Sequence, residues 1–483
     1  MSSTRRRKNH KSLCRGGGNA VLCGFILSAC QHFIPEAKSP PPPPIKEIDS
    51  RLETNAAPLR SGNGLASQNP NMAQDNSDYL EFPHSLDRFF QALATLEGGA
   101  AKRDVLITQL GDSHTVADWG TAAFRRYLQS QFGNGGRGFV ALGKPMNGYI
   151  QQGVRGDMST GWVTERPKLV QGQWAGDGYY GLNGMAIKTS RKNASAWIDI
   201  RVPITSVEIA YFKQPRGGQF DVLIDGKVIG RVSSASSVRG SGFFPMRVQR
   251  SSCRVQVRTV GDGEVRIFGA TLEHTYIGIT VDAVGSNGAR VTTPLQSNED
   301  HLMEQLRHRN PELFIVAYGT NEAGDDVPIR TYENRLTELF DRIARSVPKA
   351  SCLILSPPDR VKKTPEGWVS LPKIRAIMAF QRRVAASRGC AFYSLFNAMG
   401  GAGAIRSWAT ELPPRAQQDG VHLTREGYAL LGRRLAFSIL RAYGAWRMAH
   451  GLPPRSQAPV SVAEWRNLNY KNNEHRELTL LSQ

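Results

Sequence analysis

The chain has 483 residues, of which 40% are hydrophobic and 21% charged, so a fibrous or wholly disordered molecule is excluded and two folded units are expected. The first 30 residues carry six of the 61 Lys and Arg residues and none of the 41 Asp and Glu residues, so their removal leaves a net charge of +14. Such a surface favours polyanions, and because no zinc-finger spacing or RNA-binding signature is present, we do not expect nucleic acid as a partner.

Residues 1–30 have the layout of a secretory signal. A basic patch is followed by a short apolar run, Ala20–Leu27, and then by small residues. The run is too short to span a bilayer, which takes roughly 20 apolar residues. Leu27-Ser28-Ala29-Cys30 also matches a lipobox, so we predict an exported protein of the periplasm or cell envelope, with lipidation of Cys30 as its only membrane contact. An ordinary cleaved signal or a basic disordered tail are the alternatives.

Two polar segments lie outside the expected folded units. Residues 31–80 include five consecutive prolines, Pro40–Pro44, and predict an extended, semi-rigid tether. Residues 447–483 form a polar C-terminal tail to which we assign no function.

The segments 81–159 and 275–446 predict one α/β domain. The apolar run Val105–Leu110 ends at a tight turn, and a helical pattern follows over 117–132. Similar strand-like runs lie at 277–284, 313–318, 352–356 and 391–395. Amphipathic helical patterns lie between them, near 332–343 and 374–384. This alternation predicts a doubly wound parallel sheet with helices on both faces.

Between 160 and 274 the pattern changes to short alternating runs separated by turns such as Asp225-Gly226. We predict a β-sandwich inserted into the α/β domain. Most aromatic residues of a sandwich belong to its core, although some stack on sugars; the residues concerned are Trp174, Tyr179, Tyr180, Trp197 and Tyr211.

Three cysteines lie beyond the predicted signal, and they allow at most one disulfide. Cys352 and Cys390 each open a strand-like run, so they could face one another on neighbouring strands. Buried free thiols are an equal alternative.

Four motifs contain residues suited to nucleophilic catalysis. Ser113, in Gly111-Asp-Ser-His114, lies at a strand-to-helix turn, where backbone amides and the helix dipole stabilise an oxyanion. Asp419 and His422, three residues apart before a helix that begins near Arg425, supply a base and the acid that orients it. Asn321 follows the apolar run at 313–318, and its amide can donate to an oxyanion.

The fourth motif, Gly285-Ser-Asn-Gly288, also follows a strand-like run, and a glycine there lets a backbone amide approach a reacting carbonyl. Each motif taken singly is also explained as a turn or a surface residue. Gly133–Gly138 matches Gly-x-Gly-x-x-Gly but follows a helix, so we interpret it as a loop and expect no dinucleotide or other cofactor. No cluster has metal-ligand spacing.

Together the four motifs resemble the consensus blocks of the SGNH/GDSL hydrolase superfamily, in the order Ser, Gly, Asn and Asp-x-x-His. The resemblance covers about 85–150 and 276–445 and implies a flavodoxin-like sheet. It implies that Ser113 is the nucleophile, with His422 as base and Asp419 as its orienting acid. It also implies an oxyanion hole made by the amides of Ser113, Gly288 and Asn321.

Two features depart from or blur the family pattern. His114 stands where many members have Leu, and Gly285 competes with Gly288 for the second block.

The insertion resembles the carbohydrate-binding-module-like domain of bacterial peptidoglycan O-acetylesterases. The expected function is therefore hydrolysis of acetyl or short acyl esters on a polysaccharide, including peptidoglycan, through an acyl-serine intermediate. A polysaccharide O-acetyltransferase and a non-catalytic wall-binding protein remain the alternatives.

Overall fold

The computed structural model describes residues 79–455 except 171–172, 251 and 366. The predicted signal with Cys30, the tether up to residue 78 and residues 456–483 of the predicted tail lie outside this part. Within the described residues, no helix combines the length and the apolar character needed to cross a membrane.

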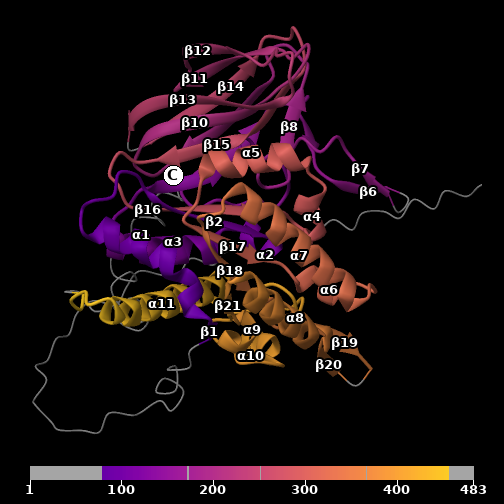
Figure 1. The fold of residues 1–483 in the computed structure, drawn as a ribbon. Helices are drawn as coiled ribbons and strands as arrows, with labels where there is room; N and C mark the ends of the chain where they lie inside the picture. Colours follow the sequence, from indigo (N-terminus) through magenta and orange to yellow (C-terminus); the bar gives the residue numbers. More distant parts are fainter. Residues whose placement is uncertain (1–78, 171–172, 251, 366, 456–483) are drawn as a thin grey trace, which may run out of the picture. The chain divides into compact units, whose positions relative to one another are not determined.

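A six-stranded sheet forms the centre of the α/β part (Figure 1). Its order is β1-β21-β18-β17-β2-β16, and every strand is parallel except β1, which pairs with β21 at one edge. Apart from β1, this is the 2-1-3-4-5 order of a flavodoxin-like sheet. The strands are β1 (Leu80–Glu81), β2 (Val105–Gly111), β16 (Ile279–Gly285), β17 (Leu313–Ala317), β18 (Ser351–Leu355) and β21 (Ala391–Tyr393).

Helices cover both faces of this sheet because its strands are apolar on both sides. In β17, Leu313 and Ile315 belong to one hydrophobic cluster, while Phe314 and Val316 belong to the other. The first cluster includes side chains of α1 (Asp87–Glu97), α3 (Trp119–Phe132) and α11 (Arg425–Ala449). The second includes α5 (Glu299–Arg309), α7 (Ile329–Ser346) and α8 (Lys373–Arg388). The predicted doubly wound α/β architecture is confirmed.

The helix predicted over 117–132 is present as α3, and a separate short helix, α2, precedes it. α2 (Ser113–Val116) ends before Ala117, and α3 begins at Trp119. Asp118 between them has a φ of 56°, a left-handed conformation that cannot continue an α-helix. Its buried carboxylate accepts hydrogen bonds from Thr121 and Arg137, and these hold the break in place.

Two antiparallel sheets are built from residues between α3 and β16. One has the order β13-β10-β15-β8-β5, with β3 also paired to β15, and the other has the order β12-β11-β14-β9-β4. Side chains from both sheets form one hydrophobic cluster. The strands are β3 (Gly136–Val140), β4 (Val154–Met158), β5 (Val163–Glu165), β8 (Ala186–Thr189), β9 (Ser195–Ile200), β10 (Ile204–Lys213), β11 (Gln219–Ile224), β12 (Lys227–Ser233), β13 (Gly240–Arg250), β14 (Cys253–Thr259) and β15 (Val265–Glu273).

Details of these sheets test several sequence interpretations. Asp225 and Gly226 join β11 to β12 with φ values of 49° and 80°, as a tight hairpin turn requires. Tyr180 and Tyr211 are buried core residues, whereas Trp174 is exposed. The interpretation of 133–138 as a loop is wrong in its second half, because β3 begins at Gly136 and pairs with β15.

Cys352 and Cys390 form a disulfide, with their Cα atoms 4.7 Å apart. Cys352 lies in β18, and Cys390 immediately precedes β21, the neighbouring strand. Of the two alternatives that the sequence left open, the structure has the paired one. Cys253 is buried.

The contact between α3 and α11 depends on two glycines. A Cβ atom at Gly432 would lie 2.1 Å from the backbone oxygen of Gly120. On the same helix, a Cβ at Gly444 would meet no heavy atom within 4 Å.

We predict opposite effects for these two positions. Gly432→Ala should lower the free energy of unfolding by about 1–3 kcal/mol, because the helices must separate to admit the methyl group. Gly444→Ala should leave it unchanged or raise it by up to about 1 kcal/mol, because alanine is the better helix former. Urea unfolding monitored by circular dichroism measures both. Equal effects of the two variants would contradict close packing at Gly432.

Candidate active site

The candidate residues gather where three neighbouring parallel strands end. Gly111, the last residue of β2, is in register with Gly285 of β16 on one side and with Ala317 of β17 on the other. The motifs with Ser113, Gly288 and Asn321 follow these three strands directly. Ligands of open α/β sheets bind at this carboxyl edge, so the sheet register alone brings three of the four motifs together.

The Ser113 turn is held by Asp112, which caps α2. The Asp112 Oδ1 atom accepts a hydrogen bond of 3.0 Å from the His114 backbone N–H. Burial raises the pKa of Asp112 to about 6, although this hydrogen bond acts in the opposite direction. α2 is only four residues long, so the helix-dipole contribution expected at Ser113 is small, and its own N–H group is the relevant donor.

Asp419 and His422 are oriented by a local turn. Asp419 Oδ1 accepts hydrogen bonds of 2.9 Å from the backbone N–H groups of Val421 and His422. Burial of the Asp419 carboxylate would raise its pKa, but these bonds and the His422 side chain outweigh burial and lower it. Asp419 therefore stays ionised. α11 begins just beyond, where Thr424 Oγ1 accepts from the Gly427 N–H.

The structure joins Ser113, His422 and Asp419 in one chain of hydrogen bonds. His422 Nδ1 lies 2.6 Å from Asp419 Oδ2, and His422 Nε2 lies 3.0 Å from Ser113 Oγ. With the Nδ1 proton donated to Asp419, the bare Nε2 atom accepts from the serine hydroxyl. The side chains of His422 and Asp419 are 36% and 43% exposed, so the pair is open to solvent.

Of the two glycines considered for the second motif, Gly285 is packed against α2. A Cβ there would lie 2.6 Å from the Val116 backbone nitrogen, whereas one at Gly288 would meet nothing within 4 Å. Gly288 has a φ of +72°, which favours glycine for conformational reasons. Among the described residues, no hydrogen-bond acceptor is assigned to the Gly288 N–H, so this group remains available to a ligand.

Asn321 lies in α6 (Thr320–Ala323) and is tied to the Gly288 loop. Its Nδ2 atom donates a hydrogen bond of 2.9 Å to the Ala289 backbone oxygen, which leaves one amide hydrogen for another acceptor. In addition, Arg290 forms a bidentate ion pair with Asp325, with both N···O distances at 2.6 Å. The loops after β16 and β17 are thus fixed against each other.

Glu322 connects these two loops by hydrogen bonds, and sequence analysis assigned it no role. Its carboxylate accepts from the Val291 N–H at 2.7 Å and from the Gly319 N–H at 3.1 Å. Burial raises the pKa of Glu322 to about 7, against the opposing effect of the Val291 hydrogen bond. The only sequence signal for this connection was the acidic residue directly after Asn321.

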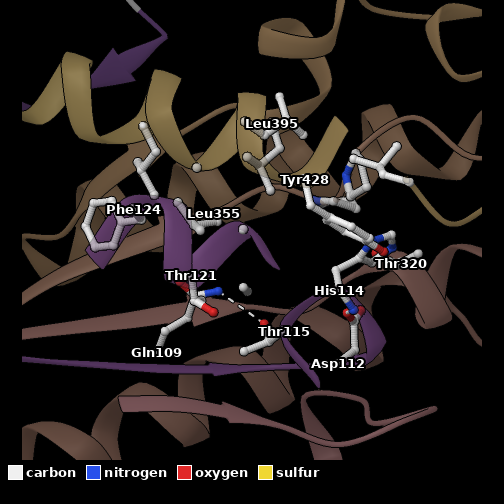
Figure 2. Close-up of a pocket in the computed structure, with 18 of the residues that line it drawn as sticks. Gln109, Asp112, His114, Thr115, Thr121, Phe124, Thr320, Leu355, Leu395 and Tyr428 are labelled. Atoms are coloured by element: carbon white, nitrogen blue, oxygen red, sulfur yellow. Dashed lines mark hydrogen bonds between the residues drawn. The ribbon is translucent and has the colours of Figure 1, made fainter. Parts of the chain in front are cut away.

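His114 and Tyr428 form a second pair beside the serine that sequence analysis did not identify. Tyr428 Oη lies 2.9 Å from His114 Nδ1, and the His114 and His422 rings are 5.5 Å apart between centroids. Burial lowers the pKa of His114 to about 3, so this imidazole is neutral near pH 7. Figure 2 shows both side chains lining a pocket, with Phe124 and Leu355 among its apolar lining residues. The pocket has a volume of about 60 Å³.

No group of three or more His, Cys, Asp or Glu side chains in the described ranges is arranged to hold a metal ion. The chemistry available at this edge is that of a serine hydroxyl, an imidazole, a carboxylate and amide donors. This set suits attack on an ester carbonyl.

Comparison with known proteins agrees with this chemistry. A model of the GDSL-like lipase/acylhydrolase family matches residues 252–430. The matched segment contains Gly288, Asn321, Asp419 and His422 but not Ser113. No curated protein matches the chain.

Among solved structures, a peptidoglycan O-acetylesterase is 25% identical and superposes with a TM-score of 0.64, covering 76% of this chain and 99% of that one. Family two carbohydrate esterases from Clostridium thermocellum, in complex with cellohexaose, and from Cellvibrio japonicus are each 12% identical with a TM-score of 0.25. They cover 56% and 61% of this chain and 99% and 98% of their own. Superpositions this weak do not bear on function.

We predict that Glu322 makes the protein less stable as the pH rises. Its ordinary pKa of 4.5 is raised to about 7 by folding, so the unfolded chain releases the proton first and stability is lost between these values. Each unit of difference between the two pKa values corresponds to about 1.4 kcal/mol, so the free energy of unfolding falls by roughly 3 kcal/mol. In urea unfolding at pH 4.5 and 7.5, Glu322→Gln should show a smaller fall than wild type.

Glu426→Gln, at an exposed position in the first turn of α11, serves as the control for loss of a carboxylate. A wild-type pH dependence in Glu322→Gln would show that the buried carboxylate does not cause the effect.

Proposed function

We propose that this chain, a carboxylic ester hydrolase of the SGNH/GDSL type that resembles peptidoglycan O-acetylesterase, removes acetyl groups from a polysaccharide through an acyl-serine intermediate. The observation that carries the mechanism is the continuous hydrogen-bond chain from Ser113 through His422 to Asp419. The structural match to a peptidoglycan O-acetylesterase supports acetylated peptidoglycan as the substrate.

In this mechanism, Ser113 Oγ attacks the acetyl carbonyl carbon while its proton passes to His422 Nε2. Asp419 remains ionised, holds the imidazole in the correct tautomer and stabilises the imidazolium. The tetrahedral intermediate collapses as His422 returns the proton to the sugar oxygen, which leaves as the alcohol. The acetyl-serine is then attacked by water, with His422 again accepting the proton, and acetate is released.

The negative charge on the former carbonyl oxygen needs donors that are already in place. We assign the Ser113 N–H, the Gly288 N–H and the second amide hydrogen of Asn321 to this oxyanion hole. Because Glu322 and the Arg290–Asp325 pair fix the donor loops, little reorganisation is needed when the charge develops.

We also propose an inserted β-sandwich domain like a carbohydrate-binding module, for which the sequence indicated residues 160–274. The two antiparallel sheets also include β3 and β4, which lie before residue 160. Their common hydrophobic cluster supports a sandwich arrangement. Asp282 of β16 connects these sheets to the α/β part. Its carboxylate accepts from the Phe139 N–H of β3 and from Arg309 of α5.

Export to the periplasm or cell envelope, with a lipid anchor at Cys30, is part of the same proposal. The Cys352–Cys390 disulfide supports an oxidising compartment. The net charge of +14 beyond residue 30 suits an anionic envelope polymer.

We predict that the purified chain releases acetate from O-acetylated peptidoglycan and none from the chemically de-acetylated polymer. Ser113→Ala and His422→Ala should abolish release while the proteins remain folded, because both residues take part in the covalent step. Asn321→Ala should retain activity about 100-fold to 1000-fold below wild type, the usual loss for one oxyanion donor. Acetate is measured enzymatically, and folding by circular dichroism.

Wild-type turnover by Ser113→Ala would disprove the mechanism. Release from other acetylated glycans alone would refute peptidoglycan as the substrate. Release that yields a newly acetylated oligosaccharide when one is added would establish the alternative acetyltransferase, and absence of any turnover would favour the wall-binding alternative.

We predict that the mature N-terminus is a lipidated Cys30, because the lipobox places this residue directly at the cleavage point. Mass spectrometry of the N-terminal peptide from the native host measures this. An unmodified terminus elsewhere would leave export without an anchor.

A further inference from the structure

A two-stranded hairpin lies against the turn that contains Asp419. It consists of β19 (Val361–Thr364) and β20 (Gly367–Ser370), which pair with each other and with no other strand of the described residues. The Val361 N–H donates a hydrogen bond of 2.9 Å to the Gly420 backbone oxygen. On the partner strand, Ser370 is paired with Val361, and its Oγ accepts from the Gly403 N–H at 2.9 Å. Both strands of the hairpin are therefore held at its open end, next to the turn with Asp419.

β20 carries Trp368, which is 39% exposed although it is a large aromatic side chain. A Cβ at Gly420 would lie 3.1 Å from Trp368 Cζ3, so the edge of the indole adjoins the catalytic turn. The Arg406 guanidinium lies over the indole ring, 4.7 Å from its centroid. Arg406 in turn donates a hydrogen bond of 3.2 Å to Gln418, the neighbour of Asp419.

These three side chains, Trp368, Arg406 and Gln418, form a continuous surface that we call the Trp368 rim. It combines an aromatic ring with a cation and an amide, and the exposed Lys362 and Lys363 lie on the adjacent strand. Sugars present apolar C–H faces that pack on indole rings and hydroxyl groups that bond to Arg and Gln. The cations add attraction for an anionic polymer.

The catalytic pair also has an incomplete cover that an occupant of the rim would supply. The Asp419 side chain is 43% exposed and that of His422 36% exposed. In water the attraction between an imidazolium and a carboxylate is weak, and it strengthens when solvent is excluded. A ligand on the Trp368 rim would lie beside Asp419 and shield the pair.

We propose that the Trp368 rim binds a pyranose ring of the substrate polysaccharide, next to the sugar that carries the acetyl ester. This inference rests on the proposed function, since it takes an acetylated polysaccharide as the ligand. The rim makes Trp368 a specificity-determining residue that favours polymer over small esters.

The test compares Trp368→Ala with Val369→Ala, a neighbour on the same strand that is 45% exposed and points to the opposite face. Substrates are soluble O-acetylated peptidoglycan chains and p-nitrophenyl acetate. Trp368→Ala should raise KM for the chains about tenfold more than KM for p-nitrophenyl acetate. Val369→Ala should leave both unchanged, and Trp368→Phe should restore most of the preference for the chains. Equal effects of Trp368→Ala on both substrates would overturn the proposal.

Measuring binding in an inactive variant tests the Trp368 rim independently of catalysis. O-acetylated peptidoglycan chains are titrated into Ser113→Ala and into the double variants with Trp368→Ala or Trp368→Phe, by calorimetry. The rim predicts about tenfold weaker binding for the Ala variant and a smaller loss for the Phe variant. Unchanged affinity in both would refute it, as would a loss in Trp174→Ala instead, which would place the sugar contact on the exposed indole of β7 (Gln173–Ala175). Absence of turnover by wild type would refute the proposed function, whereas the measured affinities test the Trp368 rim.

Discussion

The register of three parallel strands is the constraint on which the site depends. Because β16, β2 and β17 are paired so that Gly285, Gly111 and Ala317 lie side by side, the loops that follow them start at the same edge. Backbone hydrogen bonds set this alignment, and helices on both faces bury the strands that carry it. Ser113, Gly288 and Asn321, the proposed nucleophile and oxyanion donors, are brought together by this register. The loops must then be held in place, and buried polar groups do this.

Those buried groups carry a cost that their hydrogen bonds offset. Glu322 is almost fully enclosed, yet its carboxylate accepts from two backbone N–H groups on different loops. Asp112 is similarly enclosed and caps the serine turn. Burying a carboxylate without hydrogen-bond partners costs free energy. These two carboxylates have such partners, and through them they hold the loops of the site in place. The same reasoning applies to Asp282, which connects the parallel sheet to the antiparallel sheets through the Phe139 N–H of β3.

Asp419 and His422, the proposed acid–base pair, are less enclosed. They lie on a turn before α11 and remain partly exposed, whereas the partly buried His114 beside them is neutral near pH 7. Under the proposed function, a polysaccharide would cover the parts of Asp419 and His422 that the protein leaves exposed. The hairpin with Trp368 lies at the side of this turn, where the proposed rim would bind the polymer. In this proposal, the protein fixes the loops of the oxyanion hole, and the ligand completes the cover of Asp419 and His422.

The sequence by itself determined the alternation of strands and helices, the order of the four motifs and the identity of Ser113, Asn321, Asp419 and His422 as residues to consider. Those features are local, because periodicity and turn chemistry are encoded within a few residues. Tertiary structure decided what depends on distant contacts. It separated Gly288 from the packed Gly285, placed a short helix, α2, before α3 with Asp118 between them, paired Cys352 with Cys390 and showed Glu322, Tyr428 and Trp368 beside the site. Contacts such as Ser113 with His422, 309 residues apart, arise only when the whole chain packs, so no local pattern contains their distances.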